Sequence, residues 1–449
     1  EGFPAGFRYA SVFAAHAADS SEWFSNLLPV LTGLDHVPVA GETIRQPALA
    51  STLREVRDGG RDAFYAGTVA AALADYFRQT GALISRNDLA AQRTEILEPI
   101  RTTYRGLTIH GQPPVSQGLI LLEELNIVEG FDLASWGFCS PLATHVMVEA
   151  KKLAFRDREQ FMGDPRFAEV PTEILISKEH AERQRRLISL DRAMPDAPLP
   201  PQGSDTTYFC IADAEGNAVS FIQSIYHSFG CGAVDPRTGV LFNNRMLGFS
   251  LEAGHPNCLA PGKRPMHTLN TYLITDESGL RFVGGTPGGD VQVQSNLQVI
   301  TSLVDFGMNV QQAIEAPRWQ HVTADGNREK VLEIESRAPA TTTEELRRRG
   351  HLVSTIGPWQ HGSAYQLIEV DPATGAYMGG SDPRCDGHCS GWRRRHESVR
   401  ATYLRREDAE DRADSVLQGG PRTMKRNRKV CWDLVVWSLG AVVGLLPLV

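Results

Sequence analysis

The sequence lacks the features that mark several large classes of protein. Its net charge is −8 and its isoelectric point is about 5.9, so no basic excess favours nucleic-acid binding. It contains no Walker loop, no GxGxxG after a predicted strand and no GxSxG elbow. These absences argue against the commonest nucleotide-binding and serine-hydrolase sites, and we predict no cofactor.

Cysteine is also used in a way that excludes a disulfide framework. The seven cysteines stand at irregular spacing, which is typical of a reducing compartment, and we expect a cytoplasmic protein. The chain begins at Glu1 with no charged-then-apolar leader, so no signal peptide is visible. Cys385, His388 and Cys389 are zinc-ligand types, but no second pair stands at finger spacing. We therefore predict no metal site.

Long uninterrupted apolar runs are missing as well. Residues 393–449 form a charged tail that begins with Arg393-Arg-Arg and ends in an apolar segment, Val430–Val449. The part after Asp433 has sixteen residues, shorter than the roughly 20 that a membrane-spanning helix needs. Two interpretations stay open: a membrane contact by this tail, or a non-native extension.

The rest of the chain predicts a helical first half followed by a strand-rich second half. Apolar spacing predicts helices over Pro47–Arg57, Thr68–Gln79, Leu119–Glu129, Ser140–Met162, Gly289–Phe306 and Asn309–Ala316. Alternation and turn residues predict strands over Thr206–Ala212, Ala218–Tyr226, Gly239–Phe242, Thr271–Ile274, Leu280–Gly285, Leu332–Ile334, His351–Ser354 and Ala364–Val370. This order indicates layered α/β architecture. His110 and His145 are interpreted as packing or surface residues.

The most informative stretch is Asp205-Thr206-Thr207, which follows a proline-rich segment, residues 193–205. A threonine freed at its own α-amine becomes a nucleophile, because that amine can act as the base. The turn Gly285–Gly289 follows, and backbone N–H groups in such a turn can hold an oxyanion. Together these features predict a self-cleaving N-terminal-threonine amidohydrolase, whereas Thr206 alone would be an ordinary strand residue.

The chain resembles the γ-glutamyltransferases (glutathione hydrolases) of the N-terminal-nucleophile hydrolase superfamily over about residues 1–392. The resemblance rests on ordered motifs: Pro113–Gly118, Leu125–Phe131, Glu149–Arg158, Gly163–Pro165, Asp205–Phe209, Phe242–Met246, Ala260–Pro265, Thr286–Gly289, Glu315–Arg318 and Gly380–Arg384. It implies an α/β, four-layer αββα sandwich with an incomplete N-terminal part. It also implies a large-subunit portion (1–205) and a small catalytic subunit (206–392), which would form a heterodimer after cleavage.

The resemblance implies the following chemistry. The Thr206 hydroxyl attacks the Asp205 carbonyl in the precursor, and the same oxygen later attacks a small amide substrate. Ser224 stands where the family has a hydroxyl that hydrogen-bonds the nucleophile. Gly288 and Gly289 would form the oxyanion hole. A γ-glutamyl or related acyl group would then pass to water or an amine.

Departures from the family pattern concern the substrate. Family members hold the α-amine of a γ-glutamyl group with a Gln and an acidic residue, and these positions are Arg245 and Gly248 here. A Ser-Ser pair corresponds to His267-Thr268, and an Asn corresponds to Tyr226. The pattern looks like the divergent branch that includes cephalosporin acylases and oxamate amidohydrolases. Arg245 is predicted either to receive a carboxylate or to form a structural salt bridge.

A second departure is that the long segment preceding Phe3-Pro4 in the family is not part of this sequence. The resemblance therefore predicts that central strands are missing and that sheet edges are exposed. The alternative to an active proenzyme is a truncated, non-catalytic paralogue of the same family.

Overall fold

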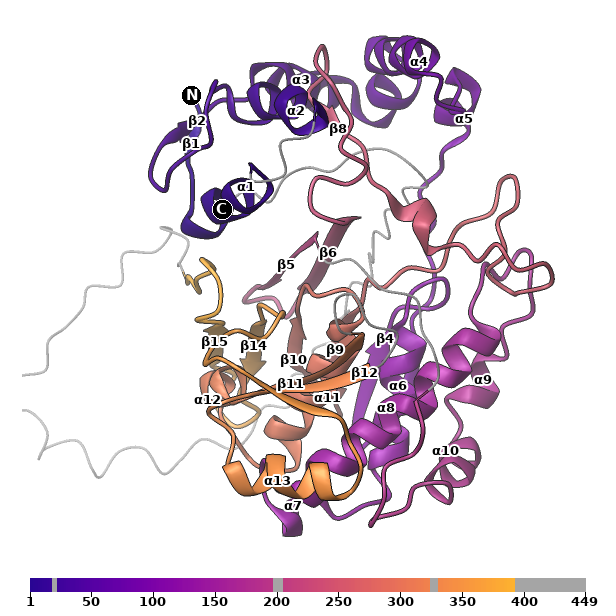
Figure 1. Cartoon of the computed structure of the whole chain (residues 1–449), viewed down its shortest axis with the longest axis vertical. Coiled ribbons are helices and arrows are strands. Elements are labelled where there is room, and N and C mark those ends of the chain that lie inside the picture. Colours follow the sequence, from indigo (N-terminus) through magenta and orange to yellow (C-terminus); the bar gives the residue numbers. More distant parts are fainter. Residues whose placement is uncertain (18–21, 197–204, 324–329, 392–449) are drawn as a thin grey trace, which may run out of the picture.

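A six-stranded antiparallel sheet forms the centre of the fold (Figure 1). The computed structural model describes residues 1–17, 22–196, 205–323 and 330–391, so the predicted tail lies outside the described residues. In spatial order the strands are β15 (Tyr377–Ser381), β14 (Gln366–Val370), β10 (Gly279–Gly285), β9 (Thr271–Asp276), β4 (Leu107–Gly111) and β3 (Ile100–Tyr104).

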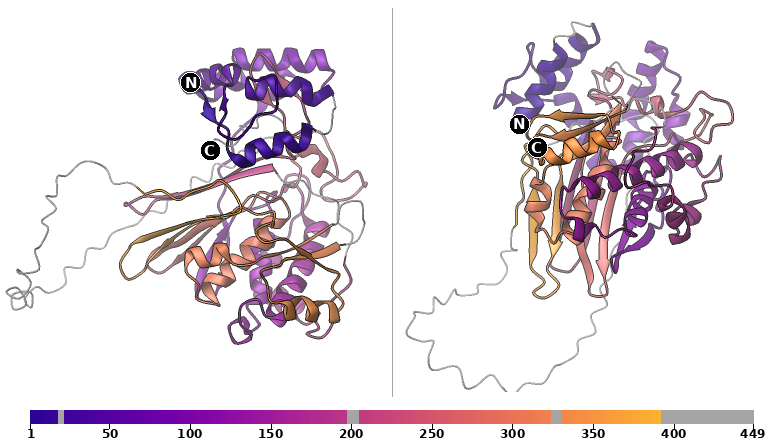
Figure 2. Two further views of the ribbon diagram at one scale, coloured as in Figure 1. Left: turned by 60° about the vertical axis from the view of Figure 1, so that its left-hand side comes forward. Right: turned by 60° about the horizontal axis from the view of Figure 1, so that its bottom comes forward.

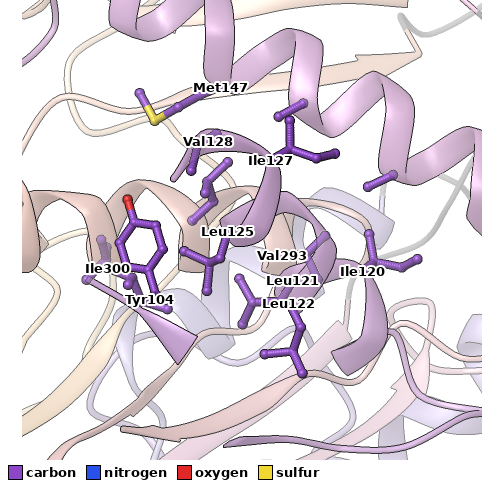
Figure 3. Packing of buried hydrophobic residues seen from close by; sticks show 14 of the residues in the cluster. Tyr104, Ile120, Leu121, Leu122, Leu125, Ile127, Val128, Met147, Val293 and Ile300 are labelled. Carbon is purple, nitrogen blue, oxygen red and sulfur yellow. The ribbon is translucent and has the colours of Figure 1, made fainter. Parts of the chain in front are cut away.

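Helices cover one face of this sheet. All of α6 (Gly118–Val128) is buried, because it lies against β3 and β4 on one side and against α8 (Pro141–Phe161) and α11 (Val291–Val304) on the other. A helix buried all round needs an apolar sequence on every side, and Leu119–Leu122 supplies one. Figure 3 shows side chains of α6 packed with Tyr104, Met147, Val293 and Ile300 in the main core.

The opposite face of the sheet carries a two-stranded hairpin made of β5 (Asp205–Ala212) and β6 (Ala218–Tyr226). Its inner face contributes Cys210, Ala212 and Ala218 to a cluster with Leu280 and other apolar residues of the sheet. Its outer face leaves apolar side chains in solvent, with exposures of 41% for Phe209, 49% for Ile211 and 45% for Val219. Among the described strands none pairs with an outer edge of this hairpin.

The N-terminal helices gather beyond the hairpin, on the side away from the sheet (Figures 1 and 2). They pack on the chain that follows β6, where Phe229 contacts Phe13 and Phe24, and Phe242 contacts Phe77. The elements of this region are β1 (Phe3–Pro4), α1 (Phe7–Ala17), α2 (Glu22–Thr32), β2 (Thr43–Ile44), α3 (Pro47–Tyr65), α4 (Thr68–Thr80), α5 (Arg86–Ala91), β7 (Val234–Asp235) and β8 (Val240–Leu241).

A smaller sheet, in the order β11–β12–β13, and several short helices complete the described chain. Their bounds are α7 (Leu133–Trp136), α9 (Thr172–Leu175), α10 (Lys178–Arg185), η1 (Arg245–Gly248), α12 (Val310–Glu315), β11 (Trp319–Thr323), β12 (Lys330–Glu335), α13 (Ala340–Arg348) and β13 (Val353–Ile356).

Most predicted elements are present, and the differences have local causes. The helix predicted over Pro47–Arg57 continues to Tyr65, because Gly60 takes a φ of +60° and lets the helix kink instead of ending. The helical first half also contains the unpredicted hairpin β3–β4. Its turn, Arg105-Gly106, has φ values of 49° and 83°, as in the two-residue turns that match strand twist. Gly106 was the signal for it.

In the described part of the chain, no helix combines the length and apolar character needed to cross a bilayer. The predicted cytoplasmic location and the membrane contact of the tail stay predictions. The six cysteines of the described chain are free thiols.

Buried histidines make the fold sensitive to acid. Burial lowers the pKa of His110 and His321 to about 4, of His267 and His361 to about 3, and of His351 to about 2. An unfolded histidine has a pKa near 6.5, so below that pH the unfolded chain binds more protons than the folded chain. The stability that these groups contribute is therefore fully present above about pH 6.5 and is lost as the pH falls towards the folded values.

We expect a lower thermal midpoint at pH 5.5 than at pH 7.5, with each such histidine contributing at most about 1.4 kcal/mol per pH unit. The difference should shrink in His110→Gln, whose ring is buried, and should persist in His388→Gln, whose side chain is exposed. Equal midpoints at the two pH values in the wild-type protein would contradict this expectation. His180 opposes part of the effect, because the hydrogen bonds from its ring to Asp157 and Glu123 raise its pKa to about 9. Its contribution is complete below about pH 6.5 and declines as the pH rises towards 9, so this single group offsets only a part of the loss from the five buried histidines.

Candidate active site

Thr206 lies at the start of β5, on the face of the hairpin that looks towards the sheet. It pairs with Ser224 of β6, and the register shifts between Asp205 and Thr206. Side chains alternate along a strand, so Thr206 shares its face with Tyr208 and Cys210. A Cβ added to Gly285 would lie 2.5 Å from Cε2 of Tyr208, which shows how closely the ring covers that glycine.

The order of these contacts indicates what lies next to Thr206. The Asp213 carbonyl, just after β5, accepts from the Tyr377 hydroxyl at 2.5 Å. Tyr377 pairs with Val370, whose carbonyl accepts from Arg281 near the start of β10. Tyr208 covers Gly285 at the end of β10. The hairpin strand therefore runs opposite to β10 across the two layers. One further step along the same face brings Thr206 level with the segment that follows Gly285, which is the predicted turn Thr286–Gly289.

That turn leads directly into the N-terminus of α11. Gly288 and Gly289 have φ values of 135° and 56°, and their carbonyl oxygens accept hydrogen bonds from Val291 N (2.9 Å) and Gln292 N (3.1 Å). No described residue accepts a hydrogen bond from the N–H of Gly288 or of Gly289. Two backbone donors at the positive end of a helix dipole form an arrangement that can stabilise an anion.

Ser224 and Arg245 meet beside the start of the hairpin. Ser224 Oγ accepts from Tyr226 N at 2.9 Å and from Arg245 Nη2 at 3.0 Å. The guanidinium also lies over the Tyr226 ring, 4.5 Å from its centroid. Tyr226 has a φ of 82° and stacks on His227. Three predicted site residues are thus brought together, because the guanidinium of Arg245 contacts both the Ser224 hydroxyl and the Tyr226 ring.

Arg245 is a buried cation without a buried anion. Only 7% of the residue is exposed, and burial lowers the pKa of its guanidinium to about 10. Among the residues whose side chains the structure describes, a set that does not include Asp205, no carboxylate comes within ion-pair distance of it. This argues against the structural salt bridge that was one of its two predicted roles. A desolvated guanidinium instead retains most of its capacity to bind a carboxylate.

The predicted pair His267-Thr268 lies close to the same groups. Both residues are buried, and burial together with the charge of Arg245 lowers the pKa of His267 to about 3, so that ring is neutral. His267 N donates to Val115 O at 3.1 Å. The carbonyl of Thr268 accepts from Gln117 Nε2 at 2.6 Å. The pair is therefore fixed by backbone contacts to the loop that precedes α6.

Tyr208 does not present its hydroxyl to the site. Its oxygen lies 2.7 Å from Ser220 Oγ between the two β layers. Gln117, Arg158 and Asp290 were given no role from the sequence, yet Gln117 contacts Gly289 and Thr268, and Arg158 contacts both Gln117 and Asp290. The first two stand inside motifs that carried the family resemblance, and that was the available signal.

Two clusters in the described chain have side chains of metal-ligand type. One is His145, Glu149 and His351; the other is Glu123, Asp157 and His180. In each, a short hydrogen bond already joins two members, 2.8 Å between His145 and His351 and 2.6 Å between His180 and Asp157. His110 and His145 are buried packing residues, as predicted.

Comparison with known proteins places this geometry in a family. The family model Gamma-glutamyltranspeptidase matches residues 1–392. The chain is 38% identical over 364 residues to a glutathione hydrolase-like YwrD proenzyme of Bacillus subtilis, covering 81% of this chain and 69% of the relative. It is 40% identical over 316 residues to an acylase ACY 1 proenzyme of a Pseudomonas species, covering 70% of this chain and 56% of the relative. The chain thus spans only part of the length of these relatives.

A solved structure gives the same result for the fold. The crystal structure of a cephalosporin acylase from Bacillus halodurans superposes with a TM-score of 0.80 at 34% sequence identity. The match covers 87% of this chain and 72% of that one. The predicted N-terminal-nucleophile hydrolase fold is confirmed by this likeness. With a family model matched over residues 1–392, the chain belongs to the gamma-glutamyltranspeptidase family.

Proposed function

We propose that this protein is a precursor that cleaves itself at the Asp205–Thr206 bond and then hydrolyses a small amide with Thr206 as the nucleophile. The observation that carries the proposal is the contact of the Tyr208 ring, two residues after Thr206 on the same face of β5, with Gly285, which precedes the Gly288–Gly289 turn whose two N–H groups have no described acceptor. A nucleophile and an oxyanion site would then face the same carbonyl. The proenzyme relatives support processing into two chains.

In the first reaction, Thr206 Oγ attacks the carbonyl carbon of Asp205 and the C–N bond of that peptide breaks. The proton of the hydroxyl passes to the departing nitrogen, which becomes the α-amine of Thr206, and an ester joins the two residues. Water then hydrolyses the ester, leaving a carboxylate on Asp205 and a free hydroxyl on Thr206. The register shift between Asp205 and Thr206 supports this step, because an irregular pairing leaves the scissile peptide outside a regular ladder.

In the second reaction, the new α-amine of Thr206 takes the proton of its own hydroxyl as Oγ attacks the substrate amide. The Gly288 and Gly289 N–H groups stabilise the oxyanion, and the amine passes the proton to the leaving nitrogen. Ser224 Oγ already accepts from Arg245 and Tyr226, so its role towards Thr206 would be to donate its O–H. Water or an amine acceptor then releases the acyl group.

The surroundings of Arg245 support an acyl group that carries a carboxylate. A γ-glutamyl group has both a carboxylate and an ammonium, and an ammonium beside a buried guanidinium would be repelled. No described carboxylate is placed to offset this repulsion, since Gly248 stands where the family has an acid. We therefore propose a dicarboxylic half-amide as the substrate class.

Self-cleavage is tested by intact mass and N-terminal sequencing of the purified protein. We expect two chains, one beginning Thr-Thr-Tyr-Phe, in the wild type, and a single chain in Thr206→Ala. Thr206→Ser should still be cut, because it keeps the hydroxyl. A single uncut wild-type chain without amidase activity would contradict the proposal and favour a non-catalytic paralogue.

The substrate class is tested with glutaryl-p-nitroanilide and γ-glutamyl-p-nitroanilide, which differ only in the ammonium group. We expect a higher kcat/KM for the glutaryl compound, because only the γ-glutamyl compound brings a cation next to Arg245. Arg245→Met should raise KM for the glutaryl compound about 10–100-fold, the worth of a hydrogen bond to a charged group.

Arg237→Met serves as the control, because Arg237 pairs with Asp235 at 3.3 Å in the β7–β8 turn and should leave both substrates unaffected. A preference for the γ-glutamyl compound, or an unchanged KM in Arg245→Met, would overturn the carboxylate assignment while leaving the nucleophile intact.

A further inference from the structure

The side chain of Gln117 forms hydrogen bonds with two separate segments of the candidate site. Its side chain is fully buried at the N-cap position of α6. One amide nitrogen donates twice, to the Thr268 carbonyl at 2.6 Å and to the Gly289 carbonyl at 3.1 Å. The substrate-side pair 267–268 and the oxyanion-side turn 288–289 are therefore connected through one side chain that belongs to neither.

A buried ion pair supports Gln117 in turn. Arg158 of α8 donates through Nη1 to Gln117 Oε1 at 3.3 Å and to Asp290 Oδ1 at 2.6 Å. Its Nη2 lies 3.4 Å from Asp290 Oδ2, so the guanidinium contacts both carboxylate oxygens. Arg158 has an exposure of 1%, and its side chain none, and Asp290 is the residue that directly follows Gly289. The turn is thus held at two adjacent residues.

The turn needs such support because glycine alone does not define its conformation. Gly288 and Gly289 both adopt positive φ, where glycine is permitted but is not confined. The direction of their N–H groups depends on the peptide planes on either side of them. Hydrogen bonds to the Gly289 carbonyl and to the Asp290 side chain fix the orientation of those peptide planes. This orientation matters because a donor displaced by about 1 Å loses much of its capacity to stabilise a transition state.

We propose that Gln117, backed by Arg158 and Asp290, is a positioning residue that holds the Gly288–Gly289 N–H groups in the geometry that stabilises the oxyanion. This inference rests on the proposed function, since it assigns Gln117 a part in that same reaction. Gln117 hydrogen-bonds to the backbone carbonyls of Thr268 and Gly289, and its proposed effect on the oxyanion is exerted through the turn.

The test compares Gln117→Glu with Gln298→Glu. Both wild-type glutamines are buried, and each donates from Nε2 to two backbone carbonyls; for Gln298 these are Gln294 O and Trp319 O, both at 2.9 Å. Each substitution removes the donor and keeps the shape of the side chain, so the two variants have a matched effect on folding. Only Gln117 contacts the turn.

With glutaryl-p-nitroanilide as the probe, we expect Gln117→Glu to lower kcat about 10–100-fold with KM changed less than about 3-fold. This loss is smaller than the ~10²–10³ for removing an oxyanion donor outright, because the donors remain but are displaced. Self-cleavage should slow in parallel, so kcat is calculated per cleaved chain measured by mass. Gln298→Glu should keep wild-type kcat and KM.

The outcomes separate the two proposals. A wild-type protein that is neither cut nor active overturns the proposed function. An active wild type in which Gln117→Glu and Gln298→Glu behave alike, or in which only KM rises in Gln117→Glu, overturns the positioning role alone.

If Gln117→Glu does not fold, Asp290→Asn takes its place, because it removes the charge that holds Arg158 while keeping the side-chain shape. It should lower kcat in the same manner, and an unchanged kcat there overturns the role.

Discussion

The closeness of the two β layers at Gly285 is the constraint on which the candidate site depends. A Cβ at Gly285 would lie 2.5 Å from the Tyr208 ring of the hairpin, and the Ser220 hydroxyl of the hairpin reaches the Gly284 carbonyl at 3.4 Å. Real carbon atoms do not approach as closely as 2.5 Å, so a side chain at position 285 would push the hairpin away from the sheet. The separation between Thr206 and the turn after Gly285 is set by this contact.

Several motifs that identify the family act as buried ion pairs that fix loops around the sheet. Arg264 pairs with Asp164 at 3.0 Å, Arg318 pairs with Asp382 at 2.7 Å, and Arg384 pairs with Glu335 at 2.7 Å. Buried pairs contribute little net stability compared with apolar packing, but loss of one partner costs about 3–5 kcal/mol because a charge stays unpaired. Their value here is to define which loop conformation is adopted. Arg158 belongs to the same group, with the difference that the loop it fixes is the candidate oxyanion turn.

The sequence was sufficient for features whose cause is local. Thr206 with its proline-rich approach, the glycine turn and the long helices α4 and α8 all follow from residue type and spacing. Features that depend on contacts between distant segments could not be predicted from the sequence. Gln117 has no local pattern that distinguishes it from any capping residue, and its role emerges only when residues 268 and 289 are brought to it. That no carboxylate among the described side chains pairs with Arg245 could likewise be seen only in the folded chain, because acidic residues are plentiful in the sequence. The hairpin β3–β4 was missed although Gly106 marked its turn, since the helical pattern on both sides dominated the interpretation.

The position of β4 has a consequence for how a cleaved molecule would behave. This strand precedes Thr206 in the chain, yet it is hydrogen-bonded to β9, which follows it, in the middle of the six-stranded sheet. A cut at residue 205 would break the covalent chain without creating two separable bodies, because the sheet and the core beneath it contain residues from both sides. Unfolding would remain a single cooperative transition. Refolding would change from a unimolecular to a bimolecular reaction, so the cut molecule would recover its structure at a rate that falls with dilution. Cleavage would thus make the loss of structure harder to reverse while leaving the folded architecture the same.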